Sequence, residues 1–286
     1  MENSANSQNT NYTKFRFIIL LFLWVIAFYP ILPGLLSTWV NHSNNSYGML
    51  VPLISLYFIW QKKRRLRLDQ VAHSNWGVVI FISSIVVYLL SYAGDVAVIA
   101  RSMMVFSLMG LVLFTLGKKN FKQLLFPLLF LLFMVPIPDS ILIEVGLPLQ
   151  LIASDISALV LRTLSIPVYQ EGNMLYFAQT QLEVAEACSG IRSISALVML
   201  SVIFCHVLRH SWWKKSILLL STVPLGMLLN IIRVSSIGLL AHFFGANVAR
   251  GFLHEFSGIA IFITAFIVLY LEFSLVSRIG VTSKTP

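Results

Sequence analysis

Charged residues are scarce in this chain of 286 residues: Asp, Glu, Lys and Arg make up 11% of it, and hydrophobic residues make up 58%. A soluble domain has roughly 25% charged and 45–50% apolar residues, so this composition excludes an ordinary water-soluble globule. Acidic residues are the rarer charge, 11 against 20 basic ones, which gives a formal net charge of +9. A nucleic-acid partner would require those cations on one solvated face. Here they lie between long apolar runs, so we expect no nucleic acid.

Cysteine is nearly absent, with two in the chain. This count excludes a disulfide framework and a multi-cysteine zinc module, and we expect no metal and no cofactor. The mean hydropathy of +0.85 instead predicts an all-α polytopic protein of the lipid bilayer.

Eight apolar runs predict about eight transmembrane helices. The first run resembles the apolar part of a signal peptide, but no small-x-small cleavage site follows it, so we expect an uncleaved span. The second run is shorter than the ~20 residues of a straight span and has to borrow loop residues. The predicted runs are 17–29, 47–60, 76–92, 97–116, 124–137, 191–207, 216–236 and 257–276.

The basic residues predict the orientation. Eight alternating spans place five basic groups on one side, which the positive-inside rule makes cytoplasmic. We therefore expect a plasma (inner) membrane protein with cytoplasmic tails at 1–14 and 277–286 and a single transmembrane domain at 15–276. Most acidic residues fall on the opposite side. The basic groups hold fifteen of the 20 Lys and Arg residues: Lys14 and Arg16; Lys62, Lys63, Arg64, Arg65 and Arg67; Lys118, Lys119 and Lys122; Arg209, Lys214 and Lys215; Arg278 and Lys284.

Two further segments are expected on the outer face. Residues 141–164 are apolar enough for a ninth span, but Glu144, Asp155 and Arg162 recur at helical spacing. A full crossing would also reverse the side of Lys214, so we predict an amphipathic or re-entrant helix. Residues 168–186 alternate like a strand, with a turn at Gly172-Asn173, and predict a small β-hairpin.

Three reactive side chains converge on the outer ends of three spans. Cys188 precedes the sixth run, Arg233 lies near the end of the seventh, and His254 precedes the eighth. A thiol is a nucleophile once it becomes a thiolate, and a helix N-terminus favours that form. A histidine can exchange the protons, and an arginine can hold an oxyanion. This set predicts nucleophilic acyl transfer by a membrane-embedded cysteine enzyme with an extracytoplasmic active site.

Other polar residues have ordinary alternatives. Cys205 lies among apolar residues and fits a buried filler, and Arg233 alone could be an interface anchor. His242, also on the outer side, is the main rival of His254, and Arg101 is a candidate partner of Asp95. The residues near the proposed site that we assign to substrate binding are Arg192, Ser189, Glu186 and Asn230, and an alternative role of Arg192 is to pair with Glu186.

The motifs resemble the exosortase/archaeosortase family, in its bacterial exosortase form. The most specific string is Val184-Ala-Glu-Ala-Cys-Ser-Gly-Ile-Arg-Ser193, followed by Asn230-Ile-Ile-Arg233 and by His254 with Ser257-Gly258 behind it. The further matching pieces are Tyr47-Gly-Met-Leu-Val-Pro-Leu-Ile-Ser-Leu-Tyr57, Val135-Pro-Ile-Pro138 and Glu171-Gly172-Asn173.

The resemblance implies a cysteine protease and transpeptidase. Its partners would be membrane-anchored proteins with a C-terminal sorting signal of the PEP-CTERM type: a Pro-Glu-Pro-type motif, a transmembrane helix and a basic tail. Cys188 would form a thioester, His254 would be the acid/base and Arg233 the oxyanion or substrate support, and a lipid or other amine would be the acceptor. Such enzymes occur in bacteria that make exopolysaccharide. Two alternatives stay open: a purely hydrolytic intramembrane protease, and a non-enzymatic transporter or assembly factor for surface polysaccharide.

Overall fold

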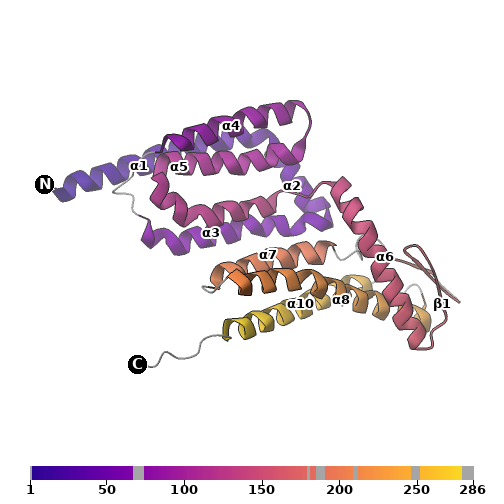
Figure 1. The fold of residues 1–286 in the computed structure, drawn as a ribbon. Coiled ribbons are helices and arrows are strands. Elements are labelled where there is room, and N and C mark those ends of the chain that lie inside the picture. Colours follow the sequence, from indigo (N-terminus) through magenta and orange to yellow (C-terminus); the bar gives the residue numbers. More distant parts are fainter. Residues whose placement is uncertain are drawn as a thin grey trace, which may run out of the picture. The chain divides into compact units, whose positions relative to one another are not determined.

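The computed structural model describes residues 2–66, 74–178, 181–184, 191–208, 212–245 and 252–278, without the side chains of residues 2–11, 43–44, 139, 191–192, 252–257 and 259. The backbone forms two compact units, residues 1–138 and 139–286. Each unit is described by itself below. The fold class is the predicted one, an all-α membrane protein with one small sheet (Figure 1).

The first unit consists of apolar helices. Three short 3-10 segments, Tyr29–Ile31, Ser43–Met49 and Leu131–Met134, connect or extend them. The segment Ser43–Met49 directly precedes α3, so the second predicted run, 47–60, begins in a 3-10 segment and continues in an α-helix of 13 residues. The helices are α1 (Glu2–Phe28), α2 (Leu32–Asn41), α3 (Leu50–Lys62), α4 (Asn75–Ala93) and α5 (Ala97–Phe130).

Helix α5 is interrupted at Gly117, whose φ of 75° and ψ of 170° are not helical. A glycine adopts a positive φ without the cost that a Cβ would impose. The chain therefore changes direction at Gly117, next to exposed Lys118 and Lys119. This break separates the fourth and fifth predicted spans where the sequence places a basic group. The second half ends at Phe130 and passes through a 3-10 turn before Pro136 and Pro138, residues that cannot continue a helix.

Helix α4 lies unusually close to the first half of α5. A Cβ added at Gly110 would be 2.6 Å from the backbone nitrogen of Phe81, and one at Gly77 would collide with the backbone of Phe114. Small residues allow helix backbones to approach each other in membranes, where dispersion replaces the hydrophobic effect as the driving force. The second half of α5 pairs instead with α3, since Ser55 Oγ donates a hydrogen bond of 2.7 Å to the carbonyl of Pro127.

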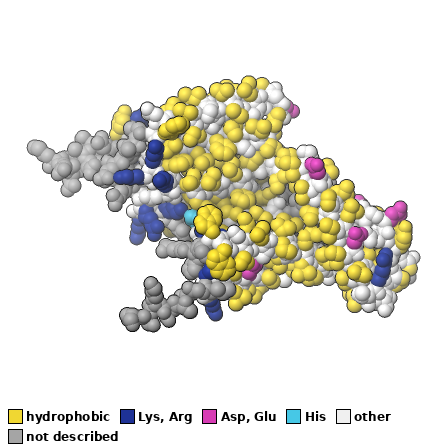
Figure 2. Space-filling view, in the orientation of Figure 1, with side chains coloured by type: hydrophobic (Ala, Val, Ile, Leu, Met, Phe, Trp, Pro, Cys, Tyr) yellow, Lys and Arg dark blue, Asp and Glu magenta, His cyan; other side chains and the backbone are white. Residues whose placement is uncertain are grey.

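Apart from Arg101, the described Lys and Arg residues of this unit gather at one end (Figure 2). The guanidinium of Arg16 lies 5.3 Å from the centre of the Phe114 ring. Lys62 Nζ donates a hydrogen bond of 3.0 Å to the carbonyl of Gln123. Phe114 and Gln123 flank the Gly117 break, so three of the five predicted basic groups meet at one end of the unit. We refer to it as the basic end.

In the part of the second unit that the structure describes, three helices run along one another and a fourth, α6, crosses them steeply (Figure 1). Hydrogen bonds from Ser201 Oγ to the carbonyl of Leu218 and from Cys205 Sγ to that of Lys215 show that α7 and α8 are antiparallel. Helix α8 has 33 residues, so it is about 50 Å long. The helices are α6 (Asp139–Thr163), α7 (Ile191–Val207), α8 (Trp212–Phe244) and α10 (Phe252–Arg278).

A small antiparallel sheet contacts α6. It contains β1 (Val168–Glu171), β2 (Met174–Phe177) and β3 (Gln181–Glu183) in the order β1-β2-β3. The predicted hairpin with its turn at Gly172-Asn173 is present, and a third short strand extends it. Gly172 has a φ of 58°, which a tight hairpin turn requires.

Each of the eight predicted runs coincides largely with a helix, although the bounds differ: residues 47–49 are in a 3-10 segment and residues 135–137 lie beyond the helix. Six helical segments in the described part of the chain are long and apolar enough to cross a membrane, and residues Ser193–Val207 form a shorter apolar helix. One of the six is Ser140–Thr163, in α6, so its length is compatible with a ninth crossing. Its steep angle to α7, α8 and α10 (Figure 1) favours the outer-face helix, which stays a prediction.

Candidate active site

The rotation of α8 is fixed by a cluster of buried apolar residues near its C-terminal end. Val234 is 1% exposed and packs in a cluster with residues of α6, β1 and β2. One turn later, a Cβ at Gly238 would lie 2.9 Å from Leu161 and 3.1 Å from Phe177. Residues three or four apart share one helix face, so this face of α8 is committed to α6 and the sheet.

Arg233 therefore extends from a different face of α8, toward α10. Its side chain is only 9% exposed. A Cβ at Gly258 of α10 would be 3.5 Å from Nη2 and 3.9 Å from Cζ of Arg233. The guanidinium thus lies against the backbone of α10 near the N-terminal end of that helix, where the absence of a side chain at position 258 leaves room for it.

The same part of α8 lies beside the start of α7. A Cβ at Gly226 would be 2.7 Å from Cγ1 of Ile194 and 3.7 Å from its Cα. From this crossing point, the rise of 1.5 Å per residue places Asn230 about 6 Å farther along α8 and Ile191 about 4.5 Å toward the start of α7. Because the two helices are antiparallel, Asn230 is level with the first turn of α7. Asn230 is 3% exposed.

Helix α6 supports α8 at this level. The fully buried Ser157 Oγ donates a hydrogen bond of 3.3 Å to the carbonyl of Ile231. A serine hydroxyl in a helix commonly donates to the carbonyl four residues earlier, so the carbonyl of Ile231 is also the expected acceptor for Ser235 Oγ. Ser235 Oγ is buried and has no hydrogen-bond partner among the residues that the structure describes. The polar contacts of α6 thus reach the turn of α8 that carries Asn230 and Arg233.

Several predicted site residues fall outside the part of the chain that the structure describes. These include Cys188, Ser189 and Glu186. Arg192 belongs to the first turn of α7 and His254 to the first turn of α10, but their side chains are also outside it. His254 is four residues before Gly258, and positions four apart occupy the same face of a helix. Its helical position is therefore one turn from the place where Arg233 meets α10.

The rival residues have other surroundings. His242 follows Arg233 by nine residues on α8, about 14 Å along the helix, and its ring contacts Phe243 with centroids 5.1 Å apart. Cys205 is half-buried beside an apolar cluster that includes Leu197, Leu218 and Leu269, which agrees with an apolar filler.

Arg101, in the first unit, donates a hydrogen bond of 3.5 Å to Thr38 Oγ1. It lines a cavity of about 160 Å³ together with Asp95. Within the described residues, no group of three His, Cys, Asp or Glu side chains is arranged to hold a metal ion.

Sequence reasoning missed the residues that position Arg233. Gly226 is a close-approach position, and Ser157 and Val234 hold α8 in place. Gly258 was named only as part of the motif behind His254, without its contact with Arg233. The one available signal was the spacing of four between His254 and Gly258 inside an apolar run. The packing of α8 between α6, α7 and α10 was needed to show that this spacing places His254 one turn from the contact between Arg233 and Gly258.

The comparison with protein families decides the identity. The family described as transmembrane exosortase (Exosortase_EpsH) matches residues 39–271. The chain belongs to the transmembrane exosortase family. The match covers most of the chain and confirms a multi-pass membrane protein, and it includes the positions of Cys188, Arg233 and His254. No curated protein and no solved structure matches the chain.

Proposed function

We propose that this exosortase is a cysteine protease and transpeptidase that cleaves the C-terminal sorting signal of exported proteins and transfers them to an acceptor. Its partners would be membrane-anchored proteins that carry a PEP-CTERM-type signal. The observation that carries the proposal is the buried guanidinium of Arg233 against α10 at Gly258, one turn from the position of His254. Family membership supports the reaction class.

A buried arginine in a membrane-spanning helix needs a reason, because an ionised side chain at bilayer depth is costly. Arg233 is not a long side chain reaching from a helix end toward water, since it is directed into the contact between α8 and α10. A guanidinium fixed in a site of low dielectric stabilises developing negative charge far better than one in water. This placement supports a role for Arg233 in holding an oxyanion or a substrate carbonyl.

The residues on either side of Cys188 also support the site. Val184, four residues before it, is 1% exposed and belongs to the cluster that contains Val234, the neighbour of Arg233. Asn173 holds Val184 through a backbone hydrogen bond of 2.8 Å. Helix α7 begins at Ile191, three residues after Cys188, and packs on α8 at Gly226. Val184 and Ile194 both contact α8 and are ten residues apart, so Cys188 lies between two points of the chain that are anchored on α8.

The proposed reaction has two steps. In the first, Cys188 Sγ bonds to the scissile carbonyl carbon, His254 accepts the thiol proton, and Arg233 stabilises the oxyanion. The carbon–nitrogen bond then breaks, and His254 returns the proton to the leaving amine. In the second, an acceptor amine attacks the thioester, gives its proton to His254 and releases the Cys188 thiolate.

The remaining predicted residues receive supporting roles in this proposal. Asn230, level with the start of α7, is a candidate hydrogen-bond donor to the substrate, and so is Ser189. Arg192 would hold substrate or pair with Glu186. The positive-inside rule places both termini in the cytoplasm and this site on the opposite, extracytoplasmic face.

A processing assay tests the proposal. The full-length chain is expressed with a tagged protein that ends in a Pro-Glu-Pro motif, a transmembrane helix and a basic tail, and the tagged product is measured by mass spectrometry. We expect cleavage with the wild type and none with Cys188→Ala, whereas Cys205→Ala should process normally as the matched control. Unchanged cleavage with Cys188→Ala would contradict the cysteine mechanism and favour a transporter or assembly factor.

The product mass separates the two enzymatic possibilities. Transfer adds the mass of an amine-bearing group to the new C-terminus, whereas hydrolysis leaves a free carboxylate. A product that carries only the free carboxylate in intact membranes would replace the transpeptidase with an intramembrane protease that uses the same thioester.

A further inference from the structure

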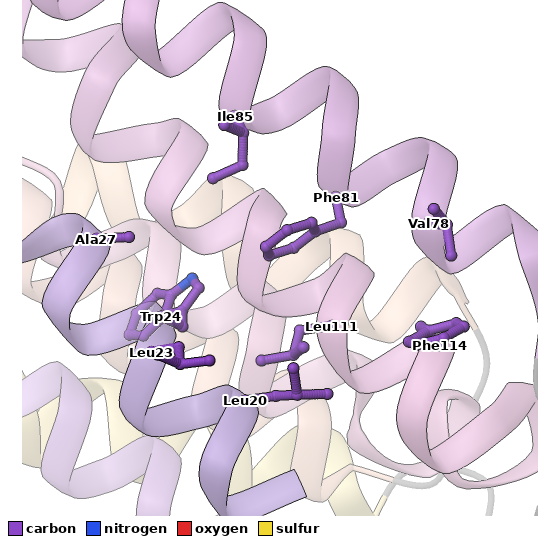
Figure 3. Close-up of a pocket in the computed structure, with 9 residues that line it drawn as sticks. All are labelled: Leu20, Leu23, Trp24, Ala27, Val78, Phe81, Ile85, Leu111 and Phe114. Carbon is purple, nitrogen blue, oxygen red and sulfur yellow. The ribbon is translucent and has the colours of Figure 1, made fainter. Parts of the chain in front are cut away.

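The first unit contains an apolar groove between helices that has no part in the proposed reaction. It has a volume of about 470 Å³, within the range of small-molecule pockets. Side chains from three helices converge on it (Figure 3). Helix α5 forms its floor, and α1 and α4 form its walls. The lining residues are Leu20, Leu23, Trp24 and Ala27 from α1, Val78, Phe81 and Ile85 from α4, and Leu111 and Phe114 from α5.

The groove exists because α1 and α4 converge at one end only. The rings of Phe28 and Tyr88 lie 4.5 Å apart, and both side chains are buried, which closes the end far from Arg16. Toward the basic end, the glycine contacts of Gly77 and Gly110 hold α4 down on α5. The space beside α1 therefore stays open and forms the groove.

The wall formed by α1 is fixed by its own contacts. Trp24 Nε1 donates a hydrogen bond of 2.8 Å to Ser107 Oγ of α5, and the Trp24 ring lies 5.2 Å from that of Phe28. A tryptophan with its polar atom satisfied keeps its orientation in an apolar environment. The groove is thus formed before any ligand binds.

Cations surround the open end of the groove. Arg16 precedes Leu20 by one turn of α1, and its guanidinium lies over the ring of Phe114, a floor residue. Lys118 and Lys119 are exposed directly after the Gly117 break. Helices α4 and α5 contain no Asp or Glu, so they supply no neutralising carboxylate. An apolar slot that ends in such a cluster is complementary to an amphiphile with an anionic head.

The closed end of the groove favours a single chain over a helix. Its α1 wall runs from Leu20 to Ala27, about 10 Å, and the contact between the Phe28 and Tyr88 rings closes it beyond Ala27. A flexible acyl chain can end in such a slot, whereas a transmembrane helix would have to continue past the closed end.

We propose that this groove binds an anionic phospholipid of the leaflet at the basic end. One acyl chain lies between α1 and α4 on the floor of α5. The phosphate lies beside Arg16, with Lys118 and Lys119 contributing to its attraction. Juxtamembrane cations are worth about 1 kcal/mol each for an anionic bilayer surface, and a groove adds acyl selectivity to that attraction. The site is independent of the proposed reaction, since none of its residues belongs to the candidate active site.

Native mass spectrometry of the purified full-length chain tests the site. The probes are phosphatidylglycerol and phosphatidylcholine with the same acyl chains, added to protein in detergent. We expect the wild type to retain phosphatidylglycerol preferentially. Arg16→Gln should lower that preference about five-fold, while Lys63→Gln, an exposed cation at the end of α3, should leave it unchanged. Equal retention of the two lipids by the wild type would overturn the proposal.

Filling the groove tests the acyl contact separately. Ala27→Phe from α1 and Val78→Phe from α4 should each reduce retention of both lipids at least ten-fold. Val25→Phe, at an exposed position of α1 that does not line the groove, is the matched control. The thermal unfolding midpoint identifies a groove variant that fails to fold. In that case the other groove variant provides the test. Wild-type lipid retention in a folded groove variant would overturn the site. The site would also be overturned if a transmembrane peptide copurified with the wild type and was lost from either groove variant.

Discussion

Arg233 of α8 and Gly258 of α10 are in contact, and the guanidinium occupies the space that a side chain larger than alanine at position 258 would need. The distance from Nη2 to a Cβ at that position would be 3.5 Å. This contact ties the arginine to the first turns of α10, the helix that contains His254. Two short motifs separated by more than twenty residues of sequence thereby belong to one place in the fold.

The first prediction concerns the identity of the cation. We expect Arg233→Gln to lower the rate of substrate cleavage by about 10²–10³-fold, the usual cost of removing one oxyanion donor. Arg233→Lys should recover little of it, because an ammonium lacks the planar fork of the guanidinium. Cleavage is followed in membranes under single-turnover conditions. Arg278→Gln, exposed at the opposite end of α10, is the control, and full activity of Arg233→Lys would show that position 233 needs only a positive charge.

The second prediction uses position 258 as a steric probe. A Cβ there would be in ordinary van der Waals contact with Arg233, so Gly258→Ala should keep most of the activity. Gly258→Leu adds three carbon atoms beyond the Cβ of Gly258→Ala, where the guanidinium lies, and should reduce cleavage at least ten-fold. Both variants should be inserted and folded alike, as judged by their unfolding midpoints. Equal activities would mean that Arg233 does not act from the position seen against α10.

The third prediction tests the orientation. In a chain with Cys188→Ala and Cys205→Ala, a single cysteine is introduced by Tyr169→Cys in β1 or by Lys119→Cys after the Gly117 break; both positions are exposed. A membrane-impermeant maleimide should label Tyr169→Cys in spheroplasts with an intact inner membrane. It should label Lys119→Cys only after permeabilisation. Labelling of both positions from one side would contradict the positive-inside assignment.

The fourth prediction concerns the contact between α4 and α5. Gly110→Val places two methyl groups against the backbone of Phe81, and overpacking of this kind costs about 1–3 kcal/mol of stability. We expect a lower unfolding midpoint in detergent. Gly34→Val is the control, since a Cβ there would have its nearest contact at 3.5 Å, with Arg101. An unchanged midpoint for Gly110→Val would show that the two helices separate at no cost.

The pattern of the sequence predicted most of the helices. Long apolar runs fix where spans lie, because a bilayer core about 30 Å thick requires them. The basic group at Lys118 and Lys119 correctly separated two spans that form one interrupted helix broken at Gly117. The third strand, Gln181–Glu183, was missed as an element of its own because three residues are too few to show an alternating pattern.

The sequence predicts the candidate site as a set of residues, which stays a prediction, and not as an arrangement. Charge counting brought Arg233 and His254 to the same side of the membrane. It could not reveal that Arg233 faces α10 while its neighbour Val234 faces α6, because adjacent residues on a helix differ by 100° and only packing chooses between them. Ser157 gave no signal either, since a single serine in an apolar helix is common.

The length of α8 has a consequence for the choice of substrate. Eighteen residues separate Lys215, next to the cytoplasmic end of the predicted span, from Arg233, a distance of about 27 Å along the helix. The proposed substrate has two corresponding features: a basic tail beyond one end of its apolar helix and a cleavage motif before the other end. Helix α8 would then act as a molecular ruler, processing substrates whose apolar helix matches this length and rejecting those shorter by two turns.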